Sequence, residues 1–383
     1  MRSGKRLMIA GLCLAIAAAA FVAAAGCSKK GDGGKAVRIG LIVPLTGDIA
    51  AMGQGMHNGA TLAVEHANAR ADVQAKGMRF ELVPVDDRAD PKEAVNGANK
   101  LISDPRIAGV VGHLNSGCSI PASKVYARKS MIMISPASTN PKLTLQGYKN
   151  VFRVCTTDNV QGGFAAEYLF KKRGFTRVAV MHDKTPYGQG LAEEFRNHFK
   201  KIGGRALTFE GINFGDKDFN AVLTKIKGMK PQAIYFGGMY SEGGLITKQA
   251  KNLGMNVPLV GGDGIFSPEY FKIAGSEADG DIATMIGAPP EKIASAKSFV
   301  ADYKKRFPGV DFQPYDAYTY DATSLIVDAV MHVGADRAAI VDYVKQVRFS
   351  GVIGETQFDK NGDTTNKAIT VYIARGGKFE AAD

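Results

Sequence analysis

Four short segments of the sequence place polar residues at points where a buried strand is expected to end. The segments span residues 112–123, 135–141, 182–190 and 261–266. Because open α/β sheets bind their ligands at the carboxyl ends of strands, these segments are candidates for one shared site. Hydrogen bonds and charge alone can hold a small molecule at such a site, without covalent chemistry.

The first two segments contain donors suited to an anion. A strand ends and a helix begins within residues 112–123, and the free N–H groups of a helix start attract negative charge. Ser116 adds a hydroxyl there, and Thr139 in the next segment can donate to the same anion. Ala137 can offer a carbonyl. For these residues taken alone, ordinary capping by serine and threonine is the alternative.

Acidic residues in the remaining segments could meet a cation. Asp263 is flanked by glycines at the end of an expected strand, where turn formation is its alternative role. Asp86, Asp87 and Asp183 also lie at strand ends, and paired carboxylates can carry out acid–base chemistry. Since no nucleophile or metal cluster accompanies them, we expect helix capping and loop bonding instead.

The sequence lacks the short motifs of the common enzyme chemistries. It contains no phosphate-binding P-loop, no HExxH zinc motif, no CxxC pair and no GxSxG nucleophile turn. Its six histidines are dispersed, and each is expected to be a surface or packing residue. These observations favour a binding protein over an enzyme, with no metal and no cofactor.

Strand and helix signals alternate along the chain in two successive runs. The expected strands are residues 37–43, 79–85, 107–111 and 131–134, then 178–181, 206–209, 233–236 and 258–260. This repetition predicts an α/β protein with two doubly wound, Rossmann-like lobes, each built on a parallel sheet. Three helices are expected after these runs, and Asn361-Gly362 is expected to turn a final strand pair around residues 358–363.

The N-terminus has the layout of a secretion signal. Residues 1–26 combine a basic start with a long uncharged run rich in alanine, and small residues precede Cys27. The segment resembles a bacterial lipoprotein signal, in which that cysteine is acylated after cleavage. An uncleaved membrane anchor is the alternative, because the run is long enough to span a bilayer. Residues 27–35 suit a flexible tether, and Ser28 is compatible with an outer-membrane location.

Charge and cysteine content add two further limits. The formal net charge of +11 falls by three, to +8, once residues 1–26 are removed. The basic residues are scattered and form no stripe interleaved with aromatic residues, so we expect no nucleic-acid partner. In the mature chain only Cys118 and Cys155 remain besides Cys27. They could form a disulfide or remain two buried thiols.

Taken together, several stretches resemble the periplasmic binding proteins for branched-chain amino acids, the leucine/isoleucine/valine-binding family of ABC importers. The matching stretches are residues 86–95, 112–123, 135–144, 183–190 and 237–238. The similarity runs from about Val37 to the last strand, nearly the whole mature chain. No single stretch is specific for the family, whereas the set is.

The resemblance implies roles in holding an amino-acid head group. Ser116 and Thr139 would bind the carboxylate. The Ala137 carbonyl, the Thr139 hydroxyl and Asp263 would take the ammonium, and Tyr187 would pack from the second lobe. Hydrogen bonds to charged groups contribute about 1.5–3 kcal/mol each, so a few of them suffice in a closed, dry cleft.

The side-chain pocket departs from the family pattern. Met52 and Met239 stand where aromatic residues are usual, and they would give a soft, adaptable wall. Ala89 and Asn115 occupy the places of the family's usual disulfide. Asn115 and Ser138 complete the candidate ligand-binding residues. The departures leave open which amino-acid side chain is preferred, including whether it is that of Leu, Ile or Val.

The resemblance also implies the type I periplasmic-binding-protein architecture, with a three-crossover hinge near Thr157, Ile286 and Glu355. The N-terminal lobe would then comprise residues 36–157 and 286–355, and the C-terminal lobe residues 158–285 and 356–383. Binding would close the lobes about these hinges.

The function implied is capture of a hydrophobic or aliphatic amino acid and its delivery to the transmembrane subunits of an ABC permease. The protein would be a monomer, held by its lipid anchor on the periplasmic side of a bacterial membrane. The same fold acting as an amide or urea receptor, or as a ligand sensor, is the alternative.

Overall fold

The computed structural model describes residues 35–289 and 292–382, and the chain from Ala36 onward forms one compact unit. The expected signal at 1–26, the expected lipidation site at Cys27 and nearly all of the tether lie outside the described residues. Among the helices that are described, none is both long and apolar enough to cross a membrane.

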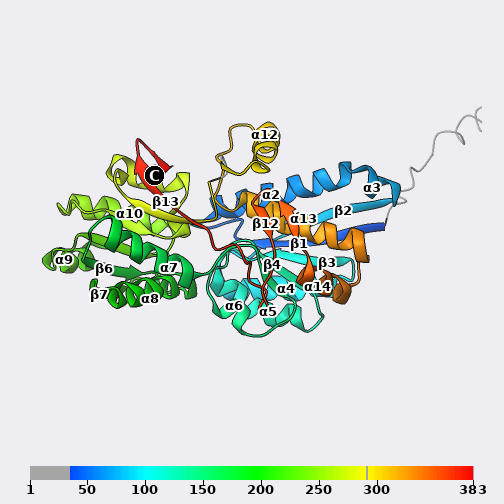
Figure 1. Ribbon diagram of the computed structural model, residues 1–383, viewed down its shortest axis with the longest axis horizontal. Coiled ribbons are helices and arrows are strands. Elements are labelled where there is room, and N and C mark those ends of the chain that lie inside the picture. The colour runs from blue at the N-terminus through cyan, green and yellow to red at the C-terminus, as the bar shows by residue number, and fades with distance from the viewer. Residues whose placement is uncertain (1–34, 290–291, 383) are drawn as a thin grey trace, which may run out of the picture. The chain divides into compact units, whose positions relative to one another are not determined.

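The first of two large sheets has the strand order β2-β1-β3-β4-β5 (Figure 1). Its strands are β1 (Lys35–Val43), β2 (Met78–Asp86), β3 (Ile107–Gly112), β4 (Ile132–Ser135) and β5 (Val151–Arg153). The neighbours from β1 through β3 and β4 to β5 pair in parallel. Strands β3 and β4 are buried along their whole length, as strands of a parallel sheet covered on both faces should be.

The second sheet has the order β14-β13-β10-β9-β8-β6-β7. Its strands are β6 (Arg177–His182), β7 (Arg205–Gly211), β8 (Ala233–Gly237), β9 (Leu259–Gly261), β10 (Ile282–Ile286), β13 (Ile369–Arg375) and β14 (Lys378–Ala381). The strands from β10 to β7 are parallel, whereas β13 and β14 add an antiparallel edge. The predicted fold class, an α/β protein with two Rossmann-like lobes each built on a parallel sheet, is confirmed, with the antiparallel edge of the second sheet as an addition.

Helices flank both sheets. Those on the first-sheet side are α2 (Ala50–Ala69), α3 (Ala71–Ala75), α4 (Pro91–Ser103), α5 (Ser116–Ala127), α6 (Lys142–Leu145), α12 (Ala296–Arg306), α13 (Asp316–Val333) and α14 (Arg337–Gln346). Those on the second-sheet side are α7 (Asp158–Glu167), α8 (Pro186–Lys201), α9 (Asn220–Gly228), α10 (Tyr240–Asn252) and α11 (Pro268–Ala274). Helices α13 and α14 therefore return to the first sheet although they follow the second in sequence.

Glycine allows the closest helix contact on the first-sheet side. Helices α2 and α13 pack along each other. A Cβ atom at Gly59 would lie 2.2 Å from the Asp316 carbonyl oxygen, so only glycine fits there. The contact holds the start of α13, and with it Tyr315, in a fixed position.

The C-terminal strand pair lies further along the chain than expected. Around Asn361-Gly362 the described residues form a turn with two isolated bridges, Phe358 to Thr364 and Arg153 to Asp363. The short pair β11 (Phe349–Gly351) and β12 (Gly354–Thr356) precedes it. The true C-terminal hairpin is β13–β14. The turn instead serves β5, because the backbone of Arg153 bonds to both Gly362 and Thr364.

The division into two lobes at the stated residues stays a prediction. The bonds from residues 362–364 to β5 favour a third crossover later than Glu355. Helices α13 and α14 lie on the first-sheet side, as the proposed division requires.

Candidate functional site

Candidate residues from both sheets lie at strand ends that face each other. Ser116 starts α5 just after β3, and Ala137 follows the adjacent β4. From the second sheet, Tyr187 starts α8 after β6, and Asp263 follows β9. A small cavity collects Leu114, Asn115, Ala137, Tyr187, Met239 and Tyr315 in its wall.

The loop after β4 is held rigidly by serine hydroxyls. The Ser138 hydroxyl lies 2.6 Å from that of Ser119 and 3.0 Å from the Leu114 carbonyl oxygen. The Ser116 hydroxyl accepts a hydrogen bond from the Asn140 N–H at 3.2 Å. Ser138 is therefore engaged in positioning the loops, while Ser116 keeps its hydroxyl proton available to donate.

Arg153 holds the loop after β4 in position through hydrogen bonds to the backbone of that loop. Its buried guanidinium donates to the carbonyl oxygens of Ser138 at 2.8 Å and Asn140 at 2.9 Å. It also pairs with Asp363. Since the two carbonyls bracket Thr139, the arginine sets the position of that candidate residue.

Asp263 occupies the opposite wall and is fully buried. Its two oxygens accept hydrogen bonds from the hydroxyls of Tyr187, at 3.0 Å, and Tyr315, at 2.6 Å. The Tyr187 oxygen in turn accepts from the Gly264 N–H at 2.9 Å. Burial raises the pKa of Asp263, and the two tyrosine hydroxyls partly oppose that rise.

Next to Asp263 lies a group of buried oxygen atoms for which the described residues provide no hydrogen-bond partner. These atoms are Asn115 Oδ1, Thr139 Oγ1, Asp158 Oδ1, Asp158 Oδ2 and Gln161 Oε1. We call this group the acceptor cluster. A Cβ atom on Gly262 would lie within 3.3 Å of both Tyr187 Oη and Gln161 Oε1. Gln161 of the acceptor cluster therefore lies close to the Tyr187 hydroxyl that donates to Asp263.

Asp158 is the most unusual member of the acceptor cluster. Its backbone N–H donates to the Thr139 carbonyl at 3.0 Å, so it lies beside the loop after β4. Burial raises the pKa of its carboxyl to about 8, and the charge of Asp263 adds to that effect. The nearby Thr139 hydroxyl lowers the pKa, though without a hydrogen bond of normal geometry.

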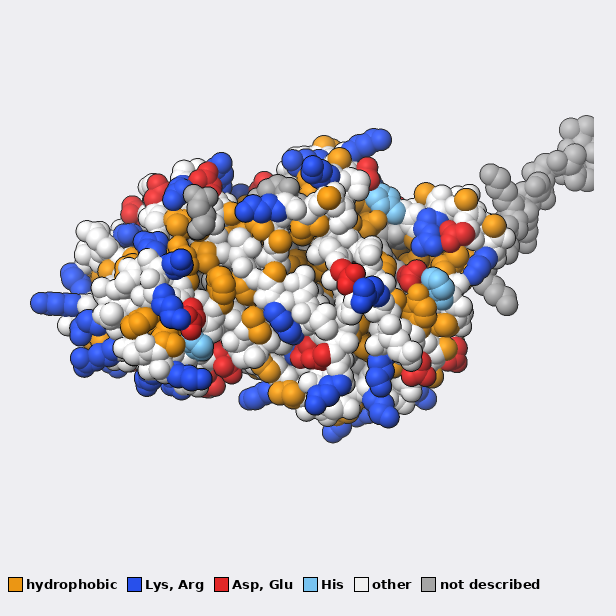
Figure 2. Space-filling view, viewed as in Figure 1, with side chains coloured by type: hydrophobic (Ala, Val, Ile, Leu, Met, Phe, Trp, Pro, Cys, Tyr) orange, Lys and Arg blue, Asp and Glu red, His pale blue; other side chains and the backbone are white. Residues whose placement is uncertain are grey.

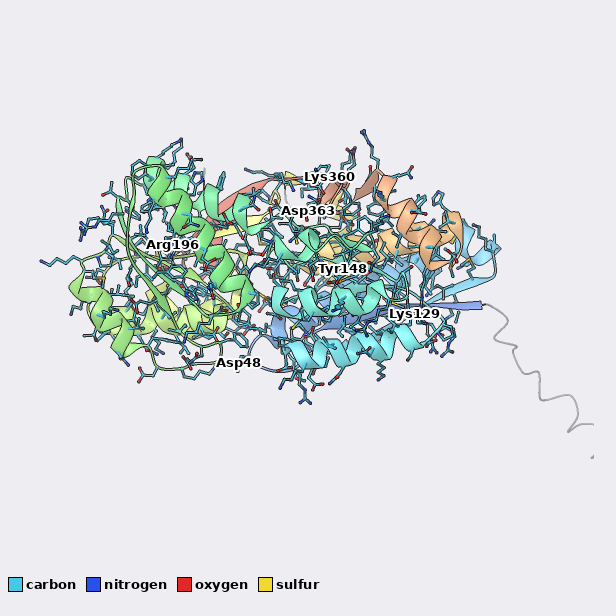
Figure 3. All side chains as sticks on the ribbon, turned by 90° about the horizontal axis from the view of Figure 1, so that it is seen from below. Asp48, Lys129, Tyr148, Arg196, Lys360 and Asp363 are labelled. Carbon is cyan, nitrogen blue, oxygen red and sulfur yellow. The ribbon has the colours of Figure 1, made fainter. Side chains whose placement is uncertain are left out.

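The two sides are in direct contact across the site. Asn140 Nδ2 donates to the Pro186 carbonyl oxygen at 2.6 Å, and Ser267 Oγ donates to Gln313 Oε1 at 2.9 Å. At the rim Lys217 pairs with Asp48 at 2.7 Å, and Figure 3 shows Asp48 where the ribbon of the first sheet meets that of the second. The cavity measures about 10 Å³, room for about one water.

The sequence-based candidates are thus only partly brought together. Asn115, Ala137, Tyr187 and Met239 line the cavity. Met52 is buried in the core on α2 and is not part of the cavity wall.

Sequence reasoning missed Tyr315, Asp158 and Gln161. Tyr315 follows Gln313-Pro314 at the start of a helix, a pattern that marks a helix boundary but not a ligand. Asp158 and Gln161 follow the crossover expected near Thr157, in a segment with no predicted binding role. The sole local signal was an acid at the start of a helix.

The predicted loop-bonding roles of the other strand-end acids are confirmed. Asp183 accepts from the N–H of Thr185 at 2.9 Å at the start of α8. Asp86 accepts from the N–H of Leu45 at 2.9 Å, and Asp87 pairs with buried His113 at 2.7 Å.

The disulfide that the sequence allowed between Cys118 and Cys155 is not formed. Both are free, buried cysteines. The Cys155 thiol instead donates to the Ser138 carbonyl at 3.6 Å, and burial raises the pKa of each thiol. Among the described residues no group of three His, Cys, Asp or Glu side chains could hold a metal ion.

Comparisons with known proteins agree on one family. Residues 36–378 match the family described as periplasmic binding protein. The chain is 35% identical over 378 residues to the Leu/Ile/Val-binding protein homolog 2 of Brucella abortus (strain 2308), covering 98% of this chain and 97% of that protein. It is also 35% identical to the leucine-, isoleucine-, valine-, threonine- and alanine-binding protein of Pseudomonas aeruginosa, over 92% of this chain and 94% of that protein.

A solved structure gives the same result. The branched-chain amino acid transporter substrate binding protein of Streptococcus pneumoniae, solved in complex with isoleucine, is similar with a TM-score of 0.83 and 30% identity. The match covers 91% of this chain and 99% of that one.

Proposed function

Because the chain belongs to the periplasmic binding protein family, among the substrate-binding proteins of branched-chain amino acid ABC transporters, we propose that it captures a free aliphatic amino acid between its two sheets. Members of this family bind solutes and are not enzymes, and they act outside the cytoplasm. The observation that carries the proposal is the acceptor cluster beside Asp263.

An ammonium group is the natural complement of the acceptor cluster. It has three N–H donors, no acceptor and a positive charge. Leaving buried acceptors unpaired is costly, and two buried carboxyls, Asp158 and Asp263, cannot both ionise cheaply without a cation between them. An arriving ammonium would satisfy both needs at once.

The carboxylate end of the ligand would face the first sheet. Ser116 opens the twelve-residue helix α5, whose free N–H groups carry partial positive charge. Ser116 Oγ already accepts from Asn140 N, so its proton points elsewhere and can be donated. Thr139 adds a second hydroxyl with no partner among the described residues.

The side chain of the ligand would contact Leu114, Met239 and Tyr315. The cavity of about 10 Å³ is far too small for leucine, so the two sides must separate and close again around the ligand. We propose that the closed form then docks on an ABC permease, and that a lipid on Cys27 keeps the protein at the membrane.

A calorimetric panel tests the ligand class. Leucine, isoleucine, valine, threonine and alanine should bind, whereas leucinamide and isovalerate, each lacking one charged end, should bind at least tenfold more weakly. Stronger binding of amides or urea than of any amino acid would overturn the proposal. Mass spectrometry of the small molecule that copurifies identifies the natural ligand independently.

Two substitutions test the assigned head-group residues. Asp263→Asn and Ser116→Ala should each weaken amino-acid binding by more than tenfold, about 1.4 kcal/mol. Asp279→Asn, an exposed position on the same side, is the matched control and should leave affinity unchanged. Unchanged affinity in both site variants would show that the head group binds elsewhere.

A further inference from the structure

A second cavity, much larger than the one at the candidate amino-acid site, is lined in part by residues of the connection between β10 and α12. Its volume is about 330 Å³, within the range of small-molecule sites. It shares no lining residue with the candidate amino-acid site. In Figure 1 the segment around α12 (yellow) and the C-terminal strands β13 and β14 (red), which both contribute to its wall, lie toward the top of the view.

Aromatic rings from both sheets form the wall. Phe266, Phe271 and Phe379 come from the second-sheet side, and Phe299, Phe312 and Tyr318 from the first-sheet side. Phe266 and Phe379 stack with ring centres 5.2 Å apart, and Phe299 meets Phe312 edge to face at 5.8 Å. These rings already pack in the geometries that aromatic pairs prefer, so a further ring can join them from the cavity.

The polar groups in this wall are few and already paired. The Ser267 hydroxyl donates to Gln313 Oε1, and the Tyr318 hydroxyl donates to the Ile286 carbonyl at 2.8 Å. Among the described lining residues the one charged side chain is Lys378, which is exposed and pairs with Glu380 at 3.0 Å. An amino-acid zwitterion would lose its hydration here without gaining partners.

We propose that this cavity is a binding site for a neutral aromatic molecule of one or two rings. A neutral ring loses little hydration on entering and gains contacts with the phenylalanines. The Met285 thioether adds a polarisable partner for its edge. Apolar cavities of this kind can remain dry and take up small apolar molecules.

Indole is a direct probe, because the protein contains no tryptophan. Indole fluorescence can therefore be excited selectively at the red edge of its absorption, where the tyrosines absorb little, and should shift to shorter wavelength, saturably, when the purified protein is added. Ala317→Phe places a ring from α13 into the cavity and should weaken indole binding at least tenfold. Ala69→Phe, exposed at the end of α2, is the matched control and should bind as the native protein does.

A second measurement locates the probe without altering the cavity. With ¹³C-methyl-labelled methionine, the Met285 signal, assigned through Met285→Leu, should shift with indole, whereas the Met239 signal should not. Asp263→Asn should leave indole binding intact while losing amino-acid binding, so this site and the amino-acid site are tested separately. Absence of saturable binding, a shift at Met239 alone, or displacement of indole by leucine would overturn the proposal.

Discussion

At the scale of single residues, two buried carboxyls in one site differ in their surroundings. Asp263 receives hydrogen bonds from two tyrosines, whereas neither oxygen of Asp158 has a partner among the described residues. Burial raises the pKa of both groups. Asp158 is therefore protonated near neutral pH until a cation arrives to favour its ionised form.

This difference predicts pH-dependent binding. The ligand ammonium favours ionised Asp158, so binding releases its proton, and affinity should rise with pH up to the pKa of about 8. Asp158→Asn should bind more weakly and lose this slope. Calorimetry in buffers of different protonation enthalpy measures both the affinity and the released proton.

The same carboxyl predicts a stability effect of opposite sign in the ligand-free protein. Because the folded pKa lies above the ordinary value of 3.8, the folded state holds the extra proton, and the free energy of unfolding falls as pH rises from about 4 to about 8.

Asp281→Asn is the control for the binding prediction, since Asp281 is equally buried but accepts hydrogen bonds from Tyr270 and Thr247 away from the cavity. A native affinity that is flat with pH would contradict the role given to Asp158.

At the scale of elements, the loop after β4 depends on its anchor. Arg153→Met would remove the charged partner of Asp363 and the guanidinium that donates to the carbonyls of Ser138 and Asn140. The Thr144 hydroxyl at Asp363 and the weak thiol donor of Cys155 at Ser138 would remain. We expect a loss of about 3–5 kcal/mol in the free energy of unfolding, measured with urea. Arg196→Met is the control, because the Arg196 side chain lies over the Phe209 ring and, within the described part of the chain, hydrogen-bonds just its neighbour Asn197. Figure 3 shows both Arg196 and Asp363. The control should lose about 0.5–1 kcal/mol.

Helix α8 predicts a second effect at this scale, through its approach to the first sheet. A Cβ atom at Gly190 would lie 2.6 Å from Asn140 Nδ2, which bonds the start of the same helix. Gly190→Ala should therefore disfavour closure and weaken amino-acid binding about fivefold or more, equivalent to about 1 kcal/mol. Gly228→Ala, with open space around it at the end of α9, should leave binding unchanged. Equal affinities of the two variants would show that closure does not need this contact.

At the scale of the whole molecule, an ion pair between Lys217 and Asp48 joins the two sides at the rim. The Lys217–Asp48 pair is half-exposed, so we expect it to contribute little to closure. Lysine and arginine side chains are scattered over the face shown in Figure 2, without one dominant patch. This face therefore shows no charged patch that would favour attachment to a membrane surface.

The proposed anchor gives a prediction at the same scale. Cys27→Ala should move the protein from the membrane fraction to the soluble fraction, and from the detergent phase to the aqueous phase in a detergent phase separation. Its affinity for leucine should stay unchanged. Metabolic labelling with a fatty acid should mark the native chain and not the variant. Label retained in the variant would place the lipid on another residue.

Much of this protein could be predicted from local patterns. The alternation of apolar strands with helices determined the α/β class. A parallel sheet is buried on both faces, so each of its strands must be apolar along its length, and that pattern is visible in the sequence. Strand-end polarity brought Asn115, Ala137, Tyr187 and Asp263 to one place, since carboxyl ends of parallel strands share an edge. The family resemblance added their roles.

Other features depend on contacts between residues far apart in the chain, which no local pattern encodes. Tyr315 reaches Asp263 from 52 residues away. The partner of buried Arg153 lies 210 residues further on. Met52 is buried on α2 and does not line the small cavity, so its expected place in the side-chain pocket stays a prediction. Sequence periodicity and polarity thus determined which elements form, while tertiary packing alone decided which side chains meet, and so left Asp158 buried without a partner.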